Sequence, residues 1–157
     1  MYKRQTWAIA GRSQNKLDAV KRRLAAPDLP TLVADSDSRE DMTRLAAQSR
    51  VIISTVGPYA RYGTTLLEAC AAEGTHYCDL TGEPQWMASV FERVSDAAEE
   101  SGARMIHCCG FDSIPSDLGV FVAQKTMMEK HGLYASSVSG RMGQSKGAVS
   151  GGTVASM

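Results

Sequence analysis

The sequence predicts an α/β fold built on a doubly wound parallel sheet. Short apolar runs alternate five times with amphipathic stretches of helical period, which is typical of strand–helix units. The run Val51–Ser54 is apolar without alternation, as expected for a parallel strand covered on both faces. Right-handed crossovers would place helices on both sides of such a sheet.

Five runs are the expected strands: Trp7–Ala10, Thr31–Ala34, Val51–Ser54, His76–Asp79 and Arg104–His107. In a sheet of this type, ligands bind beyond the carboxyl ends of the strands. The loops where function is expected therefore begin at Gly11, Asp35, Thr55, Asp79 and Cys108.

The helices are predicted from their period and their terminal residues. Leu17, Val20 and Leu24 share one face of a helix that Ser13 caps. Further helices are expected at residues 40–48, 64–73, 84–101 and about 117–125. Their boundaries rest on a Ser38–Asp41 pair that resembles a capping box, on Pro84 in a first turn, and on the terminal glycines Gly74 and Gly102.

The strand–helix rhythm ends near residue 130. Leu133–Met142 alternates as a strand does, and Gly151–Ser156 resembles the start of a helix. We therefore expect a partial dinucleotide-binding domain over residues 6–130, followed over residues 131–157 by the start of a substrate or dimerisation domain.

Composition excludes several classes of protein. The 157 residues contain 17 basic and 17 acidic side chains, so the net charge is zero, which argues against a nucleic-acid-binding protein. No apolar run reaches the length of a membrane span, and no signal peptide is visible. We expect a cytoplasmic protein with four free thiols and no metal site, because the cysteine spacing does not fit zinc.

Arg12 and Ser13 occupy the position where a dinucleotide fold selects its cofactor. An acidic residue there would bind a ribose 2′-hydroxyl and favour NAD. An arginine can instead hold a 2′-phosphate in a bidentate manner, next to the N–H groups that begin a helix. The sequence therefore favours NADP, and a solvated surface arginine beside a helix cap is the alternative.

The other loops leave alternatives open. Asp35 can hold an adenine amino group or cap the following turn. The loop Thr55–Gly63 combines Gly57 and Pro58 with two tyrosines and an arginine, which favours contact with cofactor or substrate. The acidic residues that follow the fourth strand are more typical of a capping loop than of acid–base catalysis. Cys108 and Cys109, which follow His107, are more typical of small buried thiols than of a catalytic nucleophile.

One expected signal is missing. A dinucleotide fold has a first strand followed by GxGxxG or GxxGxxG, and the sequence contains neither fingerprint.

Taken together, the loops resemble a known family. The segments AGRSQNKL, STVGPYARYG, LLEACAAEGTHYCDLTGE and HCCGFDSIPSDLG are similar to those of the saccharopine dehydrogenase-like oxidoreductases, in particular the branch of the trans-acting enoyl reductases. The resemblance covers about residues 6–119 and continues weakly into SGGTVAS. It implies a Rossmann-like NADP-binding domain and a second α/β domain.

The resemblance also implies roles for individual residues. Arg12 would bind the 2′-phosphate with help from Ser13, and Asp35 would lie at the adenine. The loop residues Thr55, Val56, Gly57 and Pro58 would run under the nicotinamide ribose, with Cys109 and Gly110 near the nicotinamide end. Phe111 and Asp112 would contact substrate. Tyr59 and Tyr62 would face the substrate cleft and are the first candidates for the catalytic proton donor.

The family implies a first strand with a glycine-rich loop before the point where this chain starts. In the strand order 3-2-1-4-5-6 that strand is central, so two inner sheet edges should be exposed and the chain should aggregate when expressed alone. Direct pairing of Trp7–Ala10 with Val51–Ser54 would contradict this register. Residues 1–5, MYKRQ, match a translated sequencing-library transposon end and are expected to be an artificial leader.

The resemblance implies an oxidoreductase that transfers a hydride from NADPH to a double bond, such as an enoyl reductase acting on a lipid or polyketide chain. Peripheral association with a membrane and a homodimer are compatible with it, and this chain is expected to be an inactive fragment. The alternative is a scaffold that binds NADP or a lipid without turnover.

Overall fold

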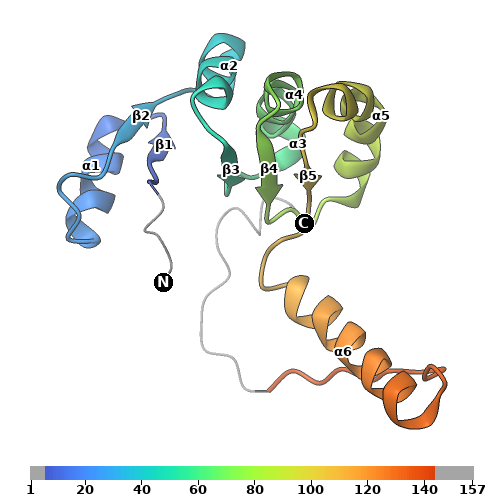
Figure 1. The fold of residues 1–157 in the computed structure, drawn as a ribbon. Coiled ribbons are helices and arrows are strands. Elements are labelled where there is room, and N and C mark those ends of the chain that lie inside the picture. Colours follow the sequence, from blue (N-terminus) through green and yellow to red (C-terminus); the bar gives the residue numbers. More distant parts are fainter. Residues whose placement is uncertain (1–5, 144–157) are drawn as a thin grey trace.

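A computed structural model describes residues 6–143 of the chain and shows an α/β fold with parallel strands (Figure 1). The elements, in order, are β1 (Ile9–Gly11), α1 (Gln14–Arg23), β2 (Thr31–Val33), α2 (Arg39–Ala47), β3 (Val51–Ser54), α3 (Tyr59–Tyr62), α4 (Thr64–Glu73), β4 (His76–Asp79), α5 (Pro84–Ser101), β5 (Met105–Ile106) and α6 (Ile114–His131). The strands expected from the sequence are confirmed to within about two residues.

The strands form two separate sheets. One contains β1 and β2, and the other has the order β3-β4-β5. All three pairings are parallel, with Ile9 opposite Thr31, Val51 opposite His76 and Tyr77 opposite Met105. β1 does not pair with β3, so the expected interruption between these two strands is confirmed.

The core lies under the three-stranded sheet. Helix α4 packs between α2 and α5, and its buried face carries Leu66, Leu67 and Cys70. Tyr77 of β4 and Val90 of α5 complete the centre, each 1% exposed. The β1–α1–β2 unit packs on its own buried Leu17, and its link to this core runs through α2 (Figure 1).

The predicted helix caps are confirmed. Ser13 Oγ accepts a hydrogen bond from Lys16 N, and Ser38 Oγ accepts one from Asp41 N. The Ser38 cap differs from a reciprocal capping box, because the Asp41 carboxylate accepts from the Asp35 N–H at 3.0 Å. Gly74 and Gly102 end α4 and α5 with φ of 72° and 77°, a left-handed conformation that glycine adopts at little cost.

The C-terminal part of the described chain differs from expectation. Helix α6 begins at Ile114, extends beyond residue 125 to His131, buries none of its side chains and projects away from the sheets (Figure 1). The strand expected over residues 133–142 is wrong. The Gln124 side chain instead holds Ala135 through two hydrogen bonds of 2.8 and 2.9 Å, and no strand lies alongside to complete a ladder in the described residues.

Two expectations fall outside the described residues, namely the artificial leader over residues 1–5 and the helix start at Gly151–Ser156. Within residues 6–143, none of the helices has both the length and the apolar character that crossing a membrane requires.

Candidate cofactor cleft

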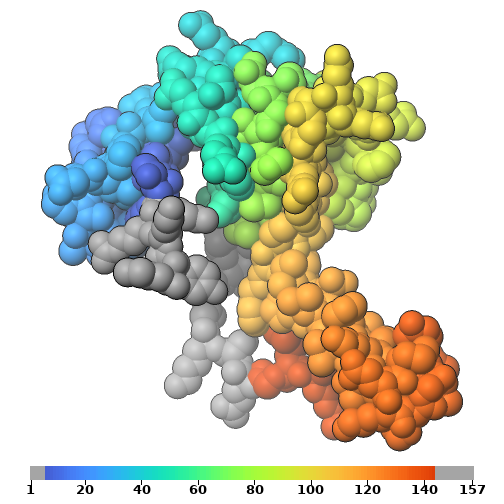
Figure 2. Space-filling model, in the orientation of Figure 1, coloured from blue at the N-terminus to red at the C-terminus, as the bar shows by residue number. Residues whose placement is uncertain are grey.

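A cleft of about 1450 Å³ separates the two sheets. One wall comes from β1 and its flanks, Thr6 to Arg12, and the other from residues 50–57 around β3. Figure 2 shows the surface hollowed between the blue N-terminal segment and the teal β3 segment. The cleft is therefore bounded by two of the loops in which the sequence predicts cofactor contacts.

Arg12 lies at the end of β1, is exposed and lines the cleft. The first turn of α1, which follows it, contains no acidic side chain. A helix N-terminus of this kind favours an anion, because its first N–H groups and the helix dipole both carry partial positive charge. Arg12 and this helix end fit the 2′-phosphate of NADP, whereas the Ser13 hydroxyl is occupied as the helix cap.

Asp35 is held by its own loop. Its carboxylate accepts a hydrogen bond from Asp37 N at 3.1 Å, and its carbonyl accepts one from Ser38 N at 3.0 Å. The neighbouring Ser36 lines the cleft. The structure thus shows the turn-capping alternative for Asp35, and an adenine contact stays a prediction.

The loop after β3 enters the cleft with Thr55, Val56 and Gly57. Pro58 is half-buried and precedes α3, a one-turn helix at a position where the sequence predicts a loop. The Glu83 carboxylate fixes this helix, because its two oxygens accept hydrogen bonds from Tyr59 N at 2.8 Å and Ala60 N at 2.9 Å.

The two candidate tyrosines have different environments. Tyr59 is 6% exposed, and its hydroxyl donates to the Ser54 carbonyl at 3.0 Å and accepts from Leu80 N at 3.2 Å. Burial raises the pKa of Tyr59. The expectation that Tyr59 faces the cleft is therefore not met, because its hydroxyl ties the β3 and β4 loops together. Tyr62 does line the cleft, with the Arg61 guanidinium 5.0 Å from its ring centre.

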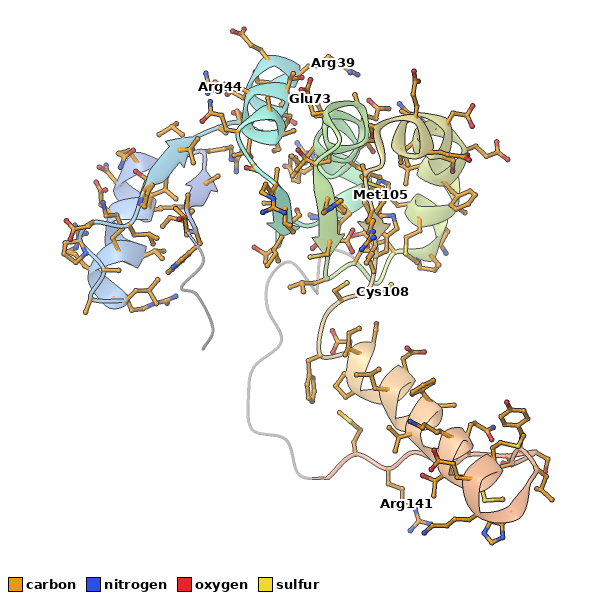
Figure 3. All side chains as sticks on the ribbon, in the orientation of Figure 1. Arg39, Arg44, Glu73, Met105, Cys108 and Arg141 are labelled. Carbon is orange, nitrogen blue, oxygen red and sulfur yellow. The ribbon has the colours of Figure 1, made fainter. Side chains whose placement is uncertain are left out.

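The residues after β5 that the sequence predicts to contact cofactor or substrate lie outside the cleft. Cys109 N donates to the Asp79 carbonyl at 2.7 Å, while Phe111 and Asp112 are exposed. Because β5 is the far neighbour of β4 in the sheet, this loop does not share the cleft with Arg12. Figure 3 shows the labelled Cys108 where the chain leaves β5 toward α6. The described structure alone does not bring Cys109, Gly110, Phe111 and Asp112 to the Arg12 cleft.

Asp79 and His107 form a pair that the sequence does not predict. Asp79 is fully buried, and its Oδ2 lies 2.7 Å from His107 Nδ1 and 3.0 Å from the Tyr77 hydroxyl. Its Oδ1 accepts from the N–H groups of Thr81 and Cys108, each at 3.1 Å. The available signal was that Asp79 and His107 end two consecutive expected strands, which places them at one sheet edge.

The described residues contain no group of three or more potential metal ligands. All four cysteines are free thiols, as the sequence predicted.

Comparison with known proteins identifies the family of this chain. A family model described as the saccharopine dehydrogenase NADP binding domain matches residues 2–106. The chain belongs to this family, and its fold is that of an NADP-binding α/β domain.

The relatives indicate the kind of protein in which this domain occurs. A Mycobacterium tuberculosis protein with the provisional name trans-acting enoyl reductase is 42% identical over 152 residues, which are 96% of this chain and 36% of that protein. The trans-acting enoyl reductase of Mycobacterium ulcerans is 46% identical over 115 residues, 72% of this chain and 28% of that protein. The chain thus spans about a third of the length of these relatives.

A solved structure shows the same fold at low sequence identity. The apo saccharopine dehydrogenase (L-Glu forming) of Saccharomyces cerevisiae superposes with a TM-score of 0.54 at 17% identity. The match covers 79% of this chain and 25% of the yeast chain, and it supports the Rossmann-like parallel architecture.

Proposed function

We propose that this chain forms the 2′-phosphate side of the NADP site in an oxidoreductase that reduces a carbon–carbon double bond. The observation that carries the proposal is the position of Arg12, which shares one cleft with Thr55, Val56 and Gly57 and precedes a helix without acidic residues in its first turn. The names of the relatives support an enoyl reductase, and a lipid or polyketide chain is the proposed substrate.

In this proposal, NADPH would supply, when bound, the hydride for one carbon of the double bond. The Tyr62 hydroxyl, at the cleft wall, delivers a proton to the other carbon. Tyr59 has a structural role, because its hydroxyl is hydrogen-bonded to the backbone of Ser54 and Leu80. The 157 residues contain no glycine-rich pyrophosphate fingerprint, so we expect no turnover from this chain by itself.

Binding of 2′-AMP and 5′-AMP, measured by calorimetry, tests the phosphate site without the pyrophosphate loop. We expect 2′-AMP to bind more tightly, and Arg12→Ala to weaken it about tenfold or more, the loss typical of a hydrogen bond to a charged group. Arg23→Ala, at the exposed far end of α1, is the matched control. Equal affinity for the two nucleotides would remove the NADP assignment of Arg12.

A chimera tests catalysis. This chain replaces the aligned region of the Mycobacterium tuberculosis relative, and NADPH oxidation is followed with a 2-enoyl thioester. We expect Tyr62→Phe to lower the rate by about a hundredfold, the usual contribution of a general acid. Tyr134→Phe, on a tyrosine that is 66% exposed, should have no effect. A chimera that binds NADPH without turnover would favour the scaffold alternative.

A further inference from the structure

Three of the four cysteines lie at the carboxyl ends of β4 and β5. Cys78 belongs to β4, and its register partner on β5 is Ile106. Cys108 and Cys109 lie just beyond the end of β5. These three side chains are partly exposed, whereas Cys70 in α4 is fully buried. The proposed hydride transfer uses none of these thiols.

A left-handed turn at Cys108 brings Cys109 back against β4. Cys108 has a φ of 59°, a conformation that residues other than glycine rarely adopt. Two hydrogen bonds to Asp79 hold the turn, because Cys108 N donates to the carboxylate at 3.1 Å and Cys109 N to the carbonyl at 2.7 Å. Strained backbone of this kind persists only where its surroundings fix it, and it is concentrated at functional sites. Since Asp79 directly follows Cys78, the turn fixes Cys109 beside Cys78.

The Cys109 thiol lies over the pair of strands that contains Cys78. Its Sγ is 3.5 Å from the carbonyl oxygen of Ile106, the residue opposite Cys78 in the register. Neighbouring strands are about 4.8 Å apart, so a thiol held at Ile106 is within reach of Cys78. Burial raises the pKa of the Cys78 thiol, and the Cys109 thiol raises it further, in part through a side-chain hydrogen bond. The two thiols are therefore direct neighbours.

The Cys108 thiol points to the opposite face of the sheet. Its Sγ lies 3.5 Å from Sδ of Met87, which belongs to α5 and packs against the core that contains Tyr77. Tyr77 and Asp79 flank Cys78 on β4 and are 1% and 0% exposed. Because successive side chains of a strand alternate between faces, Cys78 faces away from this core. Cys108 is therefore a neighbour in sequence that does not share the Cys78–Cys109 contact.

We propose that Cys78 and Cys109 form an oxidisable dithiol, a modification site that hydrogen peroxide converts into a disulfide within one chain. In the first step the Cys109 thiolate attacks one peroxide oxygen, the O–O bond breaks, and the released hydroxide takes up a proton to become water. Cys78 then attacks the sulfur of the Cys109 sulfenic acid, so that the S–S bond forms and the S–O bond breaks. The second water leaves with the Cys78 proton. Two electrons pass from the thiols to the peroxide, and a dithiol reductant reverses the change.

Cys109 reacts first, because the raised pKa of Cys78 leaves less of that thiol in the nucleophilic thiolate form. The disulfide fastens the loop after β5 to β4, so oxidation and reduction switch this loop between a tethered and a free state. The modification needs neither nucleotide nor substrate. It therefore goes beyond the proposed function and is measured separately from it.

The test treats the reduced chain with one equivalent of hydrogen peroxide in the absence of nucleotide. We expect two of the four thiols to be lost when they are counted under denaturing conditions, and to return with dithiothreitol. Trypsin leaves Cys78 in residues 62–93 and Cys109 in residues 105–125, so the bond should appear as a reducible cross-link between these two peptides. Retention of all four thiols overturns the proposal, as does a disulfide-linked dimer on a non-reducing gel.

Serine variants assign the bond, because the same two tryptic peptides also contain Cys70 and Cys108. We expect Cys78→Ser and Cys109→Ser each to abolish the cross-link and Cys108→Ser, the matched control, to keep it. Dimedone should trap a sulfenic acid at Cys109 in the Cys78→Ser variant. A cross-link that survives Cys78→Ser, or a bond between Cys108 and Cys109, overturns the proposal. The peptide map of the unmodified chain decides the matter if a variant does not fold.

The chimera described above extends the test to a full-length protein. We expect peroxide to produce the same cross-link between residues 62–93 and 105–125 there. Its absence from the folded chimera would overturn the site, because the dithiol would then be inaccessible in the longer protein. The readout is a peptide mass and not NADPH oxidation, so a chimera without turnover would count against the proposed function and leave this result standing.

Discussion

His107 Nδ1 lies 2.7 Å from Asp79 Oδ2, and this contact joins the ends of β4 and β5. His107 also packs edge-on against the rings of Tyr77 and Trp86, with centroid distances of 6.0 and 5.2 Å. The buried carboxylate therefore organises the polar centre beneath the loops that follow β4 and β5, and its removal should affect the whole three-stranded sheet.

We expect Asp79→Asn to destabilise the protein at pH 7 by about 3 kcal/mol, because it removes a buried carboxylate that makes four hydrogen-bond contacts. The amide nitrogen cannot accept the hydrogen bonds that one carboxylate oxygen now receives. Asp112→Asn makes the same chemical change at an exposed site and should be nearly neutral. Urea denaturation of both variants measures the difference, and equal stabilities would contradict a structural role for Asp79.

Stability should fall at acid pH because of Asp79. Burial by itself raises the pKa of this carboxyl, but hydrogen bonds from His107, Thr81 and Cys108 and the charge of His107 lower it below 3.8 overall. The folded state thus binds this proton less readily than the unfolded state. The resulting stabilisation is complete above the unfolded pKa and is lost as pH falls through the folded pKa. Unfolding free energies measured below about pH 5 should therefore decline less steeply in Asp79→Asn than in the unmodified chain.

Glu83 should be needed for the β3 loop. Glu83 is 9% exposed, and its carboxylate accepts hydrogen bonds from the N–H groups of Tyr59 and Ala60. We expect Glu83→Gln to lower the free energy of unfolding by about 2 kcal/mol, because the amide keeps only one of the two acceptor oxygens and has no charge. Glu92→Gln, on the exposed face of α5, is the control. If the backbone N–H of Tyr59 exchanged with solvent more slowly in Glu83→Gln than in the unmodified chain, this would contradict the role of the Glu83 carboxylate in holding the loop.

Gly63 should not tolerate a side chain. A Cβ at this position would lie 2.8 Å from Trp86 Cζ2 and 2.9 Å from the Tyr59 carbonyl oxygen. The carbonyl belongs to the backbone and cannot move aside easily. Gly63→Ala should therefore lower the free energy of unfolding by about 1–3 kcal/mol through overpacking, and it should alter the fluorescence of Trp86. Gly82→Ala is the control, because a Cβ there meets no atom within 4 Å, and it should leave the stability and the Trp86 fluorescence unchanged.

The thiols should differ in reactivity. Burial raises the pKa of Cys70 to about 12, and this side chain is fully buried. Because the thiolate is the reactive form, Cys70 should react with Ellman's reagent only after denaturation. Cys78, Cys108 and Cys109 are partly exposed and should be modified in the folded protein. Four equivalent thiols under native conditions would show that the α4 core opens readily.

Element positions were largely predictable from the sequence, because they depend on short-range rules. Val51–Ser54, Thr64–Glu73 and His76–Asp79 were predicted with the boundaries that the structure shows. The strand expected over residues 133–142 failed, because alternation alone cannot form a strand without a neighbour to receive its hydrogen bonds.

The cleft was predictable only in part. Arg12 and the loop Thr55–Gly57 lie in it, as parallel topology led us to expect. Tyr59 was not predictable as a buried support, because its burial depends on Leu80 and Glu83, which lie 21 and 24 residues away. The position of Cys109–Asp112 beyond β4 depends on strand order, which a local pattern does not contain.

The sequence by itself determined the strand–helix alternation, the caps at Ser13 and Ser38, and the resemblance to an NADP-binding family. These features follow from periodicity and from hydrogen bonds within a few residues. Only the tertiary structure decided that the Tyr59 hydroxyl joins the β3 and β4 loops, and that Asp79 meets His107, 28 residues further along the chain. Such pairings depend on how the packed helices place distant backbone segments, and no short window of sequence specifies that.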